Sequence, residues 1–230
     1  MSSFESKLGI VQWSAMQPVR KKTAQHTFWD GVFAKGYIAR NYWDVATLDR
    51  FTRKDFGVSK TSMNKEFLRG IPKNARILEV GCNVGNNLLH LQKMGYTNLY
   101  AIEIYQKAVV RAKKRIQSAQ VIQGDALDIP FKDGYFDLVF TSGVLIHIAP
   151  KNRKKVMSEI YRVSKKYIWG FEYFADKSTE IPYRGHRNVL WKAPFSELYR
   201  QAFPDLKLVR DRKYKYKDND NEDIMFLLRK

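Results

Sequence analysis

Three titratable side chains stand at the ends of short apolar segments, where they could bind or transform a small molecule. Glu103 and Asp125 end two such segments. One carboxylate could accept both hydroxyls of a ribose, and the other could receive the amino group of an adenine or cap the following turn. His147 follows a third segment. An imidazole with a pKa of about 6.5 suits removal of a proton from an oxygen nucleophile, although this one could also simply pack its loop.

A glycine-containing turn precedes these residues in the chain. The apolar residues of 76–80 lead into Gly81-Cys82-Asn83-Val84-Gly85, and a helical pattern begins at Asn86. A strand, a tight turn and a helix in succession present backbone groups to nucleotide-like ligands. The turn lacks the third glycine of the dinucleotide fingerprint, and Asn83 at its centre tolerates a left-handed backbone better than most residues. We expect Glu79 to brace this turn through backbone hydrogen bonds rather than to contact the ligand.

The elements that must position these groups alternate between strand and helix from residue 76 onward. Strands are expected at 76–81, 98–104, 120–123, 136–141, 167–171, 206–217 and 224–229, and helices at 86–94, 106–117, 151–164 and 195–202. This alternation predicts an α/β fold with a mostly parallel, seven-stranded sheet and helices on both faces. The closing hairpin has no helix between its strands, so the last strand should be antiparallel. The carboxyl ends of parallel strands share one edge, which is where open α/β sheets bind ligands.

The region before the sheet divides into an arm and a helical cap. Residues 1–22 lack periodicity and form the arm, whereas aromatic residues at near-helical spacing predict an amphipathic helix pair over 23–41. Residues 44–70 are helical again, with a break near Gly57. We therefore expect arm and cap in residues 1–70, and the catalytic domain in 71–230, as one compact unit.

Charge and composition limit the kinds of partner and the cellular compartment that the sequence predicts. The 230 residues carry a net charge of +18, with 13 Lys and Arg against 6 Asp and Glu in 1–75, 8 against 6 in 76–150, and 20 against 11 in 151–230. The excess flanks the glycine turn, which suits an anionic partner but also a merely lysine-rich surface. No apolar run could span a membrane, Met1–Gly9 is no signal peptide, and a single cysteine argues against a disulfide or a structural metal site. The cytoplasm is the default compartment.

The glycine turn, Glu103, Asp125 and the segment ending at His147 together resemble class I S-adenosylmethionine-dependent methyltransferases over residues 75–173. The resemblance implies a Rossmann-like methyltransferase fold with S-adenosylmethionine as cofactor. It places the turn against the methionine part, Glu103 at the ribose and Asp125 at the adenine. The full set of expected cofactor-binding residues is Trp29, Tyr37, Arg40, Gly81, Asn83, Gly85, Asn86, Glu103, Ile104, Asp125, Ala126 and Ser142. Arg40, on a cap helix, could pair with the methionyl carboxylate.

A narrower resemblance covers most of residues 23–230. Segments 28–31, 37–41, 143–148 and 180–186 are similar to the methylases associated with pseudaminic acid biosynthesis. That family implies a nonulosonic-acid-type sugar, or a precursor of one, as the acceptor.

The acceptor side of the site is expected from three segments. His147, His186 and Glu172 are the candidate catalytic residues, and Tyr173, Tyr183 and Arg184 are the candidate substrate-binding residues. The loop 180–186 offers an aromatic face, a fork of donors and a second possible base, although Arg184 could instead clamp the loop to the fold.

The sequence therefore predicts a methyltransferase for a small anionic acceptor, such as a hydroxyl or amine of a sugar or nucleotide-sugar. An RNA methyltransferase is a second reading, because Tyr214, Tyr216 and the alternating basic residues of 210–217 could follow a phosphate backbone. A non-catalytic cofactor-binding or scaffold protein is a third. The oligomeric state is not predicted.

Overall fold

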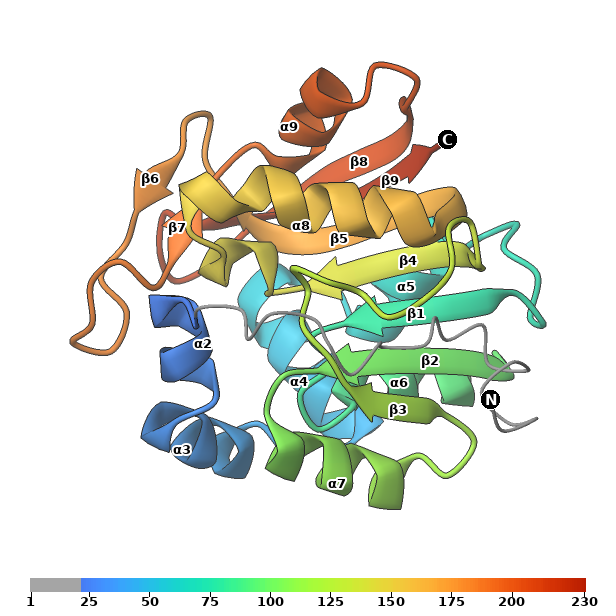
Figure 1. The fold of residues 1–230 in the computed structure, drawn as a ribbon, viewed down its shortest axis with the longest axis horizontal. Coiled ribbons are helices and arrows are strands. Elements are labelled where there is room, and N and C mark those ends of the chain that lie inside the picture. The colour runs from blue at the N-terminus through green and yellow to red at the C-terminus, as the bar shows by residue number, and fades with distance from the viewer. Residues whose placement is uncertain (1–21) are drawn as a thin grey trace.

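A computed structural model describes residues 22–230, and a seven-stranded sheet forms its centre (Figure 1). Its strands are β1 (Arg76–Val80), β2 (Asn98–Glu103), β3 (Gln120–Gln123), β4 (Phe136–Ser142), β5 (Ser164–Phe174), β8 (Lys207–Lys215) and β9 (Glu222–Arg229). They lie in the order β3-β2-β1-β4-β5-β9-β8. Strands β1 to β5 are parallel, and β9 is antiparallel to both β5 and β8. The predicted mostly parallel sheet with an antiparallel last strand is confirmed.

Helices cover both faces of the sheet, as the alternation of elements predicted. Helix α8 (Pro150–Val163) and helix α9 (Phe195–Ala202) pack on one face, with α8 in front of the sheet in Figure 1. The opposite face carries α4 (Val45–Phe56), α5 (Lys60–Phe67), α6 (Asn86–Lys93) and α7 (Gln106–Arg115). Gly57 takes a left-handed conformation (φ +81°) and ends α4, which explains the break expected there.

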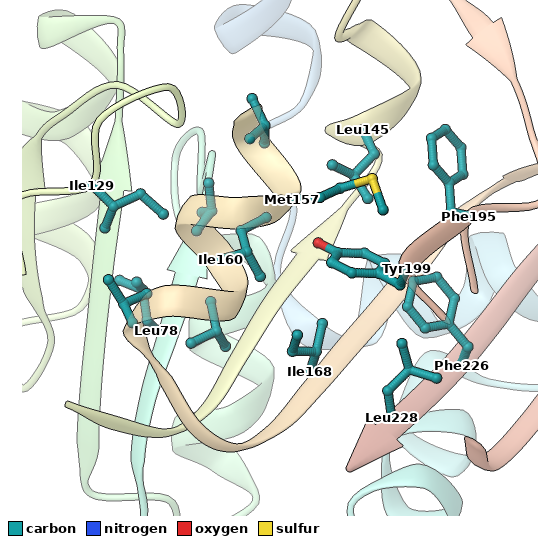
Figure 2. Close-up of a cluster of buried hydrophobic side chains, with 14 of the residues drawn as sticks. Leu78, Ile129, Leu145, Met157, Ile160, Ile168, Phe195, Tyr199, Phe226 and Leu228 are labelled. Atoms are coloured by element: carbon teal, nitrogen blue, oxygen red, sulfur yellow. The ribbon is translucent and has the colours of Figure 1, made fainter. Parts of the chain in front are cut away.

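Each face of the sheet buries its own hydrophobic cluster because successive strand residues point to opposite sides. Ile77 packs among α4 to α7, whereas its neighbour Leu78 packs beneath α8. Figure 2 shows the cluster that contains Leu78, in which Met157 and Ile160 of α8 lie against side chains of the sheet and of α9. A strand buried on both faces reads as a continuous apolar run, which is the pattern that predicted β1.

Two short helices form a cap at the carboxyl ends of the parallel strands (Figure 1). They are α2 (Ala24–Trp29) and α3 (Val32–Arg40). Thr23 begins α2 through a reciprocal pair of hydrogen bonds with His26, since the hydroxyl accepts from the His26 amide and the His26 ring accepts from the Thr23 amide. Ala34 and Ile38 of α3 pack on Val84, Tyr105 and Ala108 of the domain beneath. The arm expected at 1–22 lies, apart from Lys22, outside the described residues.

The connection between β5 and α9 contains a small sheet that the sequence did not predict. Strands β6 (Thr179–Glu180) and β7 (Trp191–Lys192) pair in antiparallel fashion, and the loop between them lies beside the cap in Figure 1. Two residues are too few for an alternating hydrophobic pattern, so neither strand was visible from periodicity. A tight turn inside the loop is closed by reciprocal backbone hydrogen bonds of 2.9 Å between Tyr183 and His186. A single 3₁₀ turn, η1 (Leu145–His147), follows β4.

Strand β8 forms the outer edge of the sheet, with β9 on its inner side. Its pairing with β9 is interrupted between Leu208 and Arg210, which leaves Val209 in a bulge with 43% of its surface exposed. Most of the other side chains of β8 are exposed, and many are Lys or Arg. Among residues 22–230, no helix is both long enough and apolar enough to cross a membrane.

Candidate functional site

A cavity of about 280 Å³ lies at the carboxyl edge of the sheet, between the strand ends and the cap. Its wall is made by the glycine turn after β1, the ends of β2, β3 and β4, helices α2 and α3, part of α4 and the first residue of α5. The parallel register explains this convergence, since it brings the carboxyl ends of neighbouring strands to one edge.

The glycine turn has the backbone that its residue types require. Gly81, Asn83 and Gly85 have φ values of +76°, +49° and +80°, the left-handed region that favours glycine and tolerates asparagine. A Cβ on Gly81 would lie 2.7 Å from Cγ2 of Val144, so crowding excludes a side chain there as well. The predicted left-handed conformation of Asn83 is confirmed. Gly81 and Asn83 line the cavity, whereas Gly85 caps the start of α6.

Glu103 connects this turn to the start of α7. One carboxylate oxygen accepts the amide of Asn83 at 2.9 Å, and the other accepts the amide of Tyr105 at 2.9 Å. Burial raises the pKa of the carboxyl group, and these backbone hydrogen bonds oppose that rise. Glu103 lines the cavity, and each oxygen keeps a second lone pair that can accept a hydroxyl.

Asp125, at the adjacent edge of the cavity, holds the cap. One carboxylate oxygen accepts the amide of Leu127 at 2.9 Å, and the other lies 3.0 Å from Nε2 of His26. Since Nδ1 of His26 accepts the Thr23 amide, the proton of the neutral ring sits on Nε2 and faces Asp125. The predicted alternatives for Asp125, ligand contact or turn capping, are therefore both compatible with its position, because it caps the turn and also lines the cavity.

His147 lies on the cavity wall below the cap. Its Nδ1 is 2.7 Å from the carbonyl oxygen of Val189, which can only accept, so Nδ1 carries the proton and Nε2 keeps a lone pair. Burial lowers the pKa of His147 to about 4. The ring is therefore neutral near pH 7, the form in which a histidine can take up a proton.

Aromatic side chains of the cap enclose His147. Its ring centroid lies 4.6 Å from that of Trp29 and 5.4 Å from that of Tyr183, and Trp29 in turn lies 5.1 Å from Tyr37. Trp29 and Tyr37 line the cavity as predicted for a covering helix. Burial raises the pKa of Tyr37, so its hydroxyl stays protonated. Phe33, 5.8 Å from Tyr183, links the cap to the loop between β6 and β7.

The structure corrects the catalytic role expected for Glu172. This carboxylate is buried, does not line the cavity, and accepts the amides of Val144 at 3.2 Å and Ile146 at 3.4 Å. Burial raises its pKa to about 7. Because those amides belong to the segment that leads into His147, Glu172 positions that segment rather than contacting a substrate.

Five other expected residues do not line the cavity, among them Tyr183, although its ring lies 5.4 Å from that of His147. Arg40 is exposed, and its guanidinium folds back over Gly36 of its own helix, so the expected pairing with a methionyl carboxylate is not supported. Arg184 and His186 are exposed on the loop between β6 and β7, and the guanidinium of Arg184 lies 5.9 Å from the Tyr183 ring centroid. Tyr173 packs toward Tyr216, at 6.4 Å between centroids.

The remaining expected cofactor-binding residues do line the cavity, namely Asn86, Ile104, Ala126 and Ser142. The polar groups of Asn86 are already used, because its amide nitrogen donates to the Asn41 carbonyl at 2.8 Å and its oxygen accepts from Trp43 and Arg115. Asn86 thus fastens the end of the cap to α6.

Sequence reasoning missed His26 and Lys60, which also line the cavity. His26 sits in the helix that was recognised for its aromatic residues, and the pattern Thr-x-x-His resembles a capping box without its usual Glu or Gln. Lys60 follows Ser59 at the start of a predicted helix, where a lysine reads as an exposed surface residue.

Comparison with known proteins agrees with this geometry. Residues 78–167 match the family model described as "Methyltransferase domain". An uncharacterized methyltransferase of Synechocystis sp. is 34% identical over 95 residues, which are 41% of this chain and 44% of the relative. Norajmaline N-methyltransferase of Rauvolfia serpentina is 33% identical over 100 residues, which are 40% of this chain and 32% of the relative. The chain thus spans less than half the length of these curated relatives.

Residues 78–167 are therefore similar in sequence to methyltransferase domains. A solved structure shows the same fold over nearly the whole chain: magnesium protoporphyrin IX methyltransferase from Synechocystis, with bound SAH, is 15% identical with a TM-score of 0.67, covering 91% of this chain and 100% of that one. The fold is that of the S-adenosylmethionine-dependent methyltransferases of solved structure, and the one from Synechocystis holds SAH, the form of the cofactor that has lost its methyl group.

The wall of the cavity fits this cofactor. Oδ1 of Asn83 and Nε1 of Trp29 are buried without a hydrogen-bond partner among the described residues, so each can bind a ligand group without losing a bond. Glu103 follows Gly81 by 22 residues, close to the spacing of about 20 at which an acidic residue binds the ribose in dinucleotide folds. The donor set thus suits a ligand that carries hydroxyl, amino and carboxylate groups.

Proposed function

We propose that this protein transfers a methyl group from S-adenosylmethionine to a hydroxyl, or to an amine, of a small anionic acceptor of the sugar or nucleotide-sugar class. The observation that carries the proposal is His147, which lines the cavity and whose Nδ1 is fixed on the Val189 carbonyl at 2.7 Å, so that Nε2 keeps its lone pair. A fixed base beside a cofactor cavity suits an acceptor that must lose a proton.

The cofactor supplies an electrophilic methyl group on a sulfonium. The residues of the chain then have three tasks: Glu103 and Asp125 orient the adenosine, the aromatic cap excludes water, and His147 receives the proton of the acceptor. With cofactor and acceptor bound, the methyl group would pass from the sulfur to the acceptor oxygen and leave a thioether, and Nε2 of His147 would take up the hydroxyl proton. Methyl transfer is an in-line displacement, so most of the rate acceleration should come from aligning the acceptor oxygen with the methyl group inside the site.

The loop between β6 and β7 supports a small acceptor at the entrance. Tyr183 contacts the His147 ring, while the neighbouring Arg184 is exposed and left-handed (φ +49°). An exposed guanidinium beside the catalytic histidine can form a bidentate pair with a carboxylate or phosphate. The resemblance to pseudaminic acid-associated methylases supports a sugar acid as that acceptor.

The polyanion alternative has less aromatic surface than the sequence suggested. Tyr214 is 5% exposed and presents no face on which a base could stack, and the half-buried Tyr216 ring packs 4.5 Å from that of Phe56. The basic side chains of β8 remain exposed, but they lie at the edge of the sheet farthest from β3, with β5 and β9 between them and β4.

Transfer of label distinguishes the candidate functions. The protein is incubated with methyl-labelled S-adenosylmethionine and a host extract that is then split into small-molecule and RNA fractions. We expect label in the anionic small molecules, and we expect Arg184→Ala to reduce it. Label found only in RNA would contradict the acceptor class. Cofactor binding without transfer to either fraction would favour the non-catalytic function.

A His147→Gln substitution tests the base. We expect the transfer rate to fall by roughly 10² to 10⁴, the usual contribution of a positioned general base, while affinity for S-adenosylhomocysteine stays within about twofold. The matched control is His90→Gln, which changes a histidine in α6 that is buried and does not line the cavity. Full activity in His147→Gln would remove this residue from the reaction.

A further inference from the structure

Lys60 is a buried cation, 2% exposed, whose ammonium group has no hydrogen-bond or ion-pair partner among residues 22–230. It lies 3.9 Å above the centroid of the Phe171 ring, and both residues line the cavity. Burying an ammonium group without a hydrogen-bond partner is costly, and the rings of Phe171 and Trp169 offset only part of that cost.

The local fold fixes Lys60 where a lysine is poorly tolerated. Ser59 caps α5, which makes Lys60 its first residue, and the Lys60 amide donates to the hydroxyl of Thr52 at 2.7 Å. The positive end of the helix dipole disfavours a cation at this position. Burial lowers the pKa of Lys60 to about 8, although Asp223, Glu79 and Glu172 oppose the shift. Burial and the helix dipole both act against a lysine here, so a ligand that pairs with the ammonium group would explain its presence.

Complementary unsatisfied acceptors line the same cavity. Oε1 of Glu79 accepts from Asn87 at 2.8 Å, but Oε2 is buried without a partner among the described residues, as is Oδ1 of Asn83. Lys60 is among the charges that act on Glu79, whose pKa burial raises to about 8. The wall here therefore offers one ammonium donor and two oxygen acceptors.

We propose that Lys60 binds the α-carboxylate of S-adenosylmethionine, while Glu79 and Asn83 accept hydrogen bonds from its α-amino group. An amino-acid zwitterion carries an ammonium and a carboxylate on one carbon, which matches the pairing of these groups in the wall. This inference rests on the proposed function for its cofactor. It replaces Arg40, which is exposed, with Lys60, and it gives Glu79 a ligand contact in place of the bracing role expected from the sequence.

The inference is tested with two ligands that differ only in the carboxylate. Binding of S-adenosylmethionine and of decarboxylated S-adenosylmethionine is measured by titration calorimetry to the wild type, to Lys60→Met and to Lys65→Met. Lys65 is an exposed lysine of the same helix and serves as the matched control. Circular dichroism establishes that each variant is folded.

We expect the wild type and Lys65→Met to bind S-adenosylmethionine roughly tenfold or more tighter than its decarboxylated form, the order for a charge-assisted hydrogen bond. Lys60→Met should bind the two ligands within about twofold. The inference would be overturned if folded Lys60→Met kept the full preference for S-adenosylmethionine over its decarboxylated form. Equal binding of both ligands by the wild type would also overturn it, and this comparison does not depend on the folding of any variant. A wild type that binds neither ligand would overturn the proposed cofactor together with this assignment.

Discussion

A Glu103→Gln substitution tests how the sheet edge recognises the ribose. Both carboxylate oxygens already accept backbone amides at 2.9 Å, so the group is held in place and its remaining lone pairs have a fixed direction. Glutamine keeps the shape but replaces one acceptor oxygen with an NH₂ group. That NH₂ faces the amide of Asn83 or Tyr105, donor against donor, and cannot accept a hydroxyl.

The expected loss follows from the bonds removed. A hydrogen bond to a charged group contributes about 1.5–3 kcal/mol, so loss of one ribose bond should weaken binding of S-adenosylhomocysteine roughly 10- to 150-fold. Titration calorimetry measures this directly. Glu197→Gln, an exposed acid on α9, controls for the change in net charge.

A second ligand separates ribose recognition from loosening of the turn. The 2′-deoxy form of S-adenosylhomocysteine should bind the wild type more weakly than the parent ligand, whereas Glu103→Gln should discriminate little between the two. Burial raises the pKa of Glu103 and the ribose favours the ionised form, so wild-type affinity should fall as the pH is lowered through that raised pKa. Unchanged affinity in Glu103→Gln would refute the assignment.

Two further predictions concern stability. Gly81→Ala should lower the free energy of unfolding, measured in urea, by about 1–3 kcal/mol. The loss should exceed that of Gly95→Ala, because both glycines have positive φ but only a Cβ at 81 would meet another atom, 2.7 Å away. Equal losses in the two variants would show that crowding by Val144 contributes nothing. Burial raises the pKa of Glu172 from an ordinary value of 4.5 to about 7, so the stability tied to its protonated form is present below pH 4.5 and is lost as the pH rises to about 7. The loss has an upper bound of about 3 kcal/mol, and urea unfolding of Glu172→Gln across this range should show a shallower slope than the wild type.

The sheet and the cofactor side of the cavity were predictable because local pattern determines them. A continuous apolar run predicted β1, and glycines at 81 and 85 predicted the left-handed turn that the structure contains. The positions of Glu103 and Asp125 follow from those strands alone, since each ends a parallel strand and the carboxyl ends meet at one edge.

The errors arose where tertiary contacts decide the direction of a side chain. Glu172 ends β5 beside the cavity, but the amides of the segment after β4 turn its carboxylate into the protein. Arg40 was assigned from the apolar character of its helix, and it faces away from the cavity. Lys60 carries no sequence signal, because its burial depends on the pairing of α4 with α5 over Phe171.

The two outer strands of the sheet give the positive charge of this chain a role that requires no polyanion. An outermost strand offers unpaired amide and carbonyl groups to which another chain can add, which is a route to aggregation. On one side β3 has only four residues. On the other side β8 is long, but Val209 bulges out of its ladder and Lys and Arg side chains extend from it into solvent. Two copies approaching edge to edge would meet a kinked strand and like charges, so part of the +18 acts as protection against self-association.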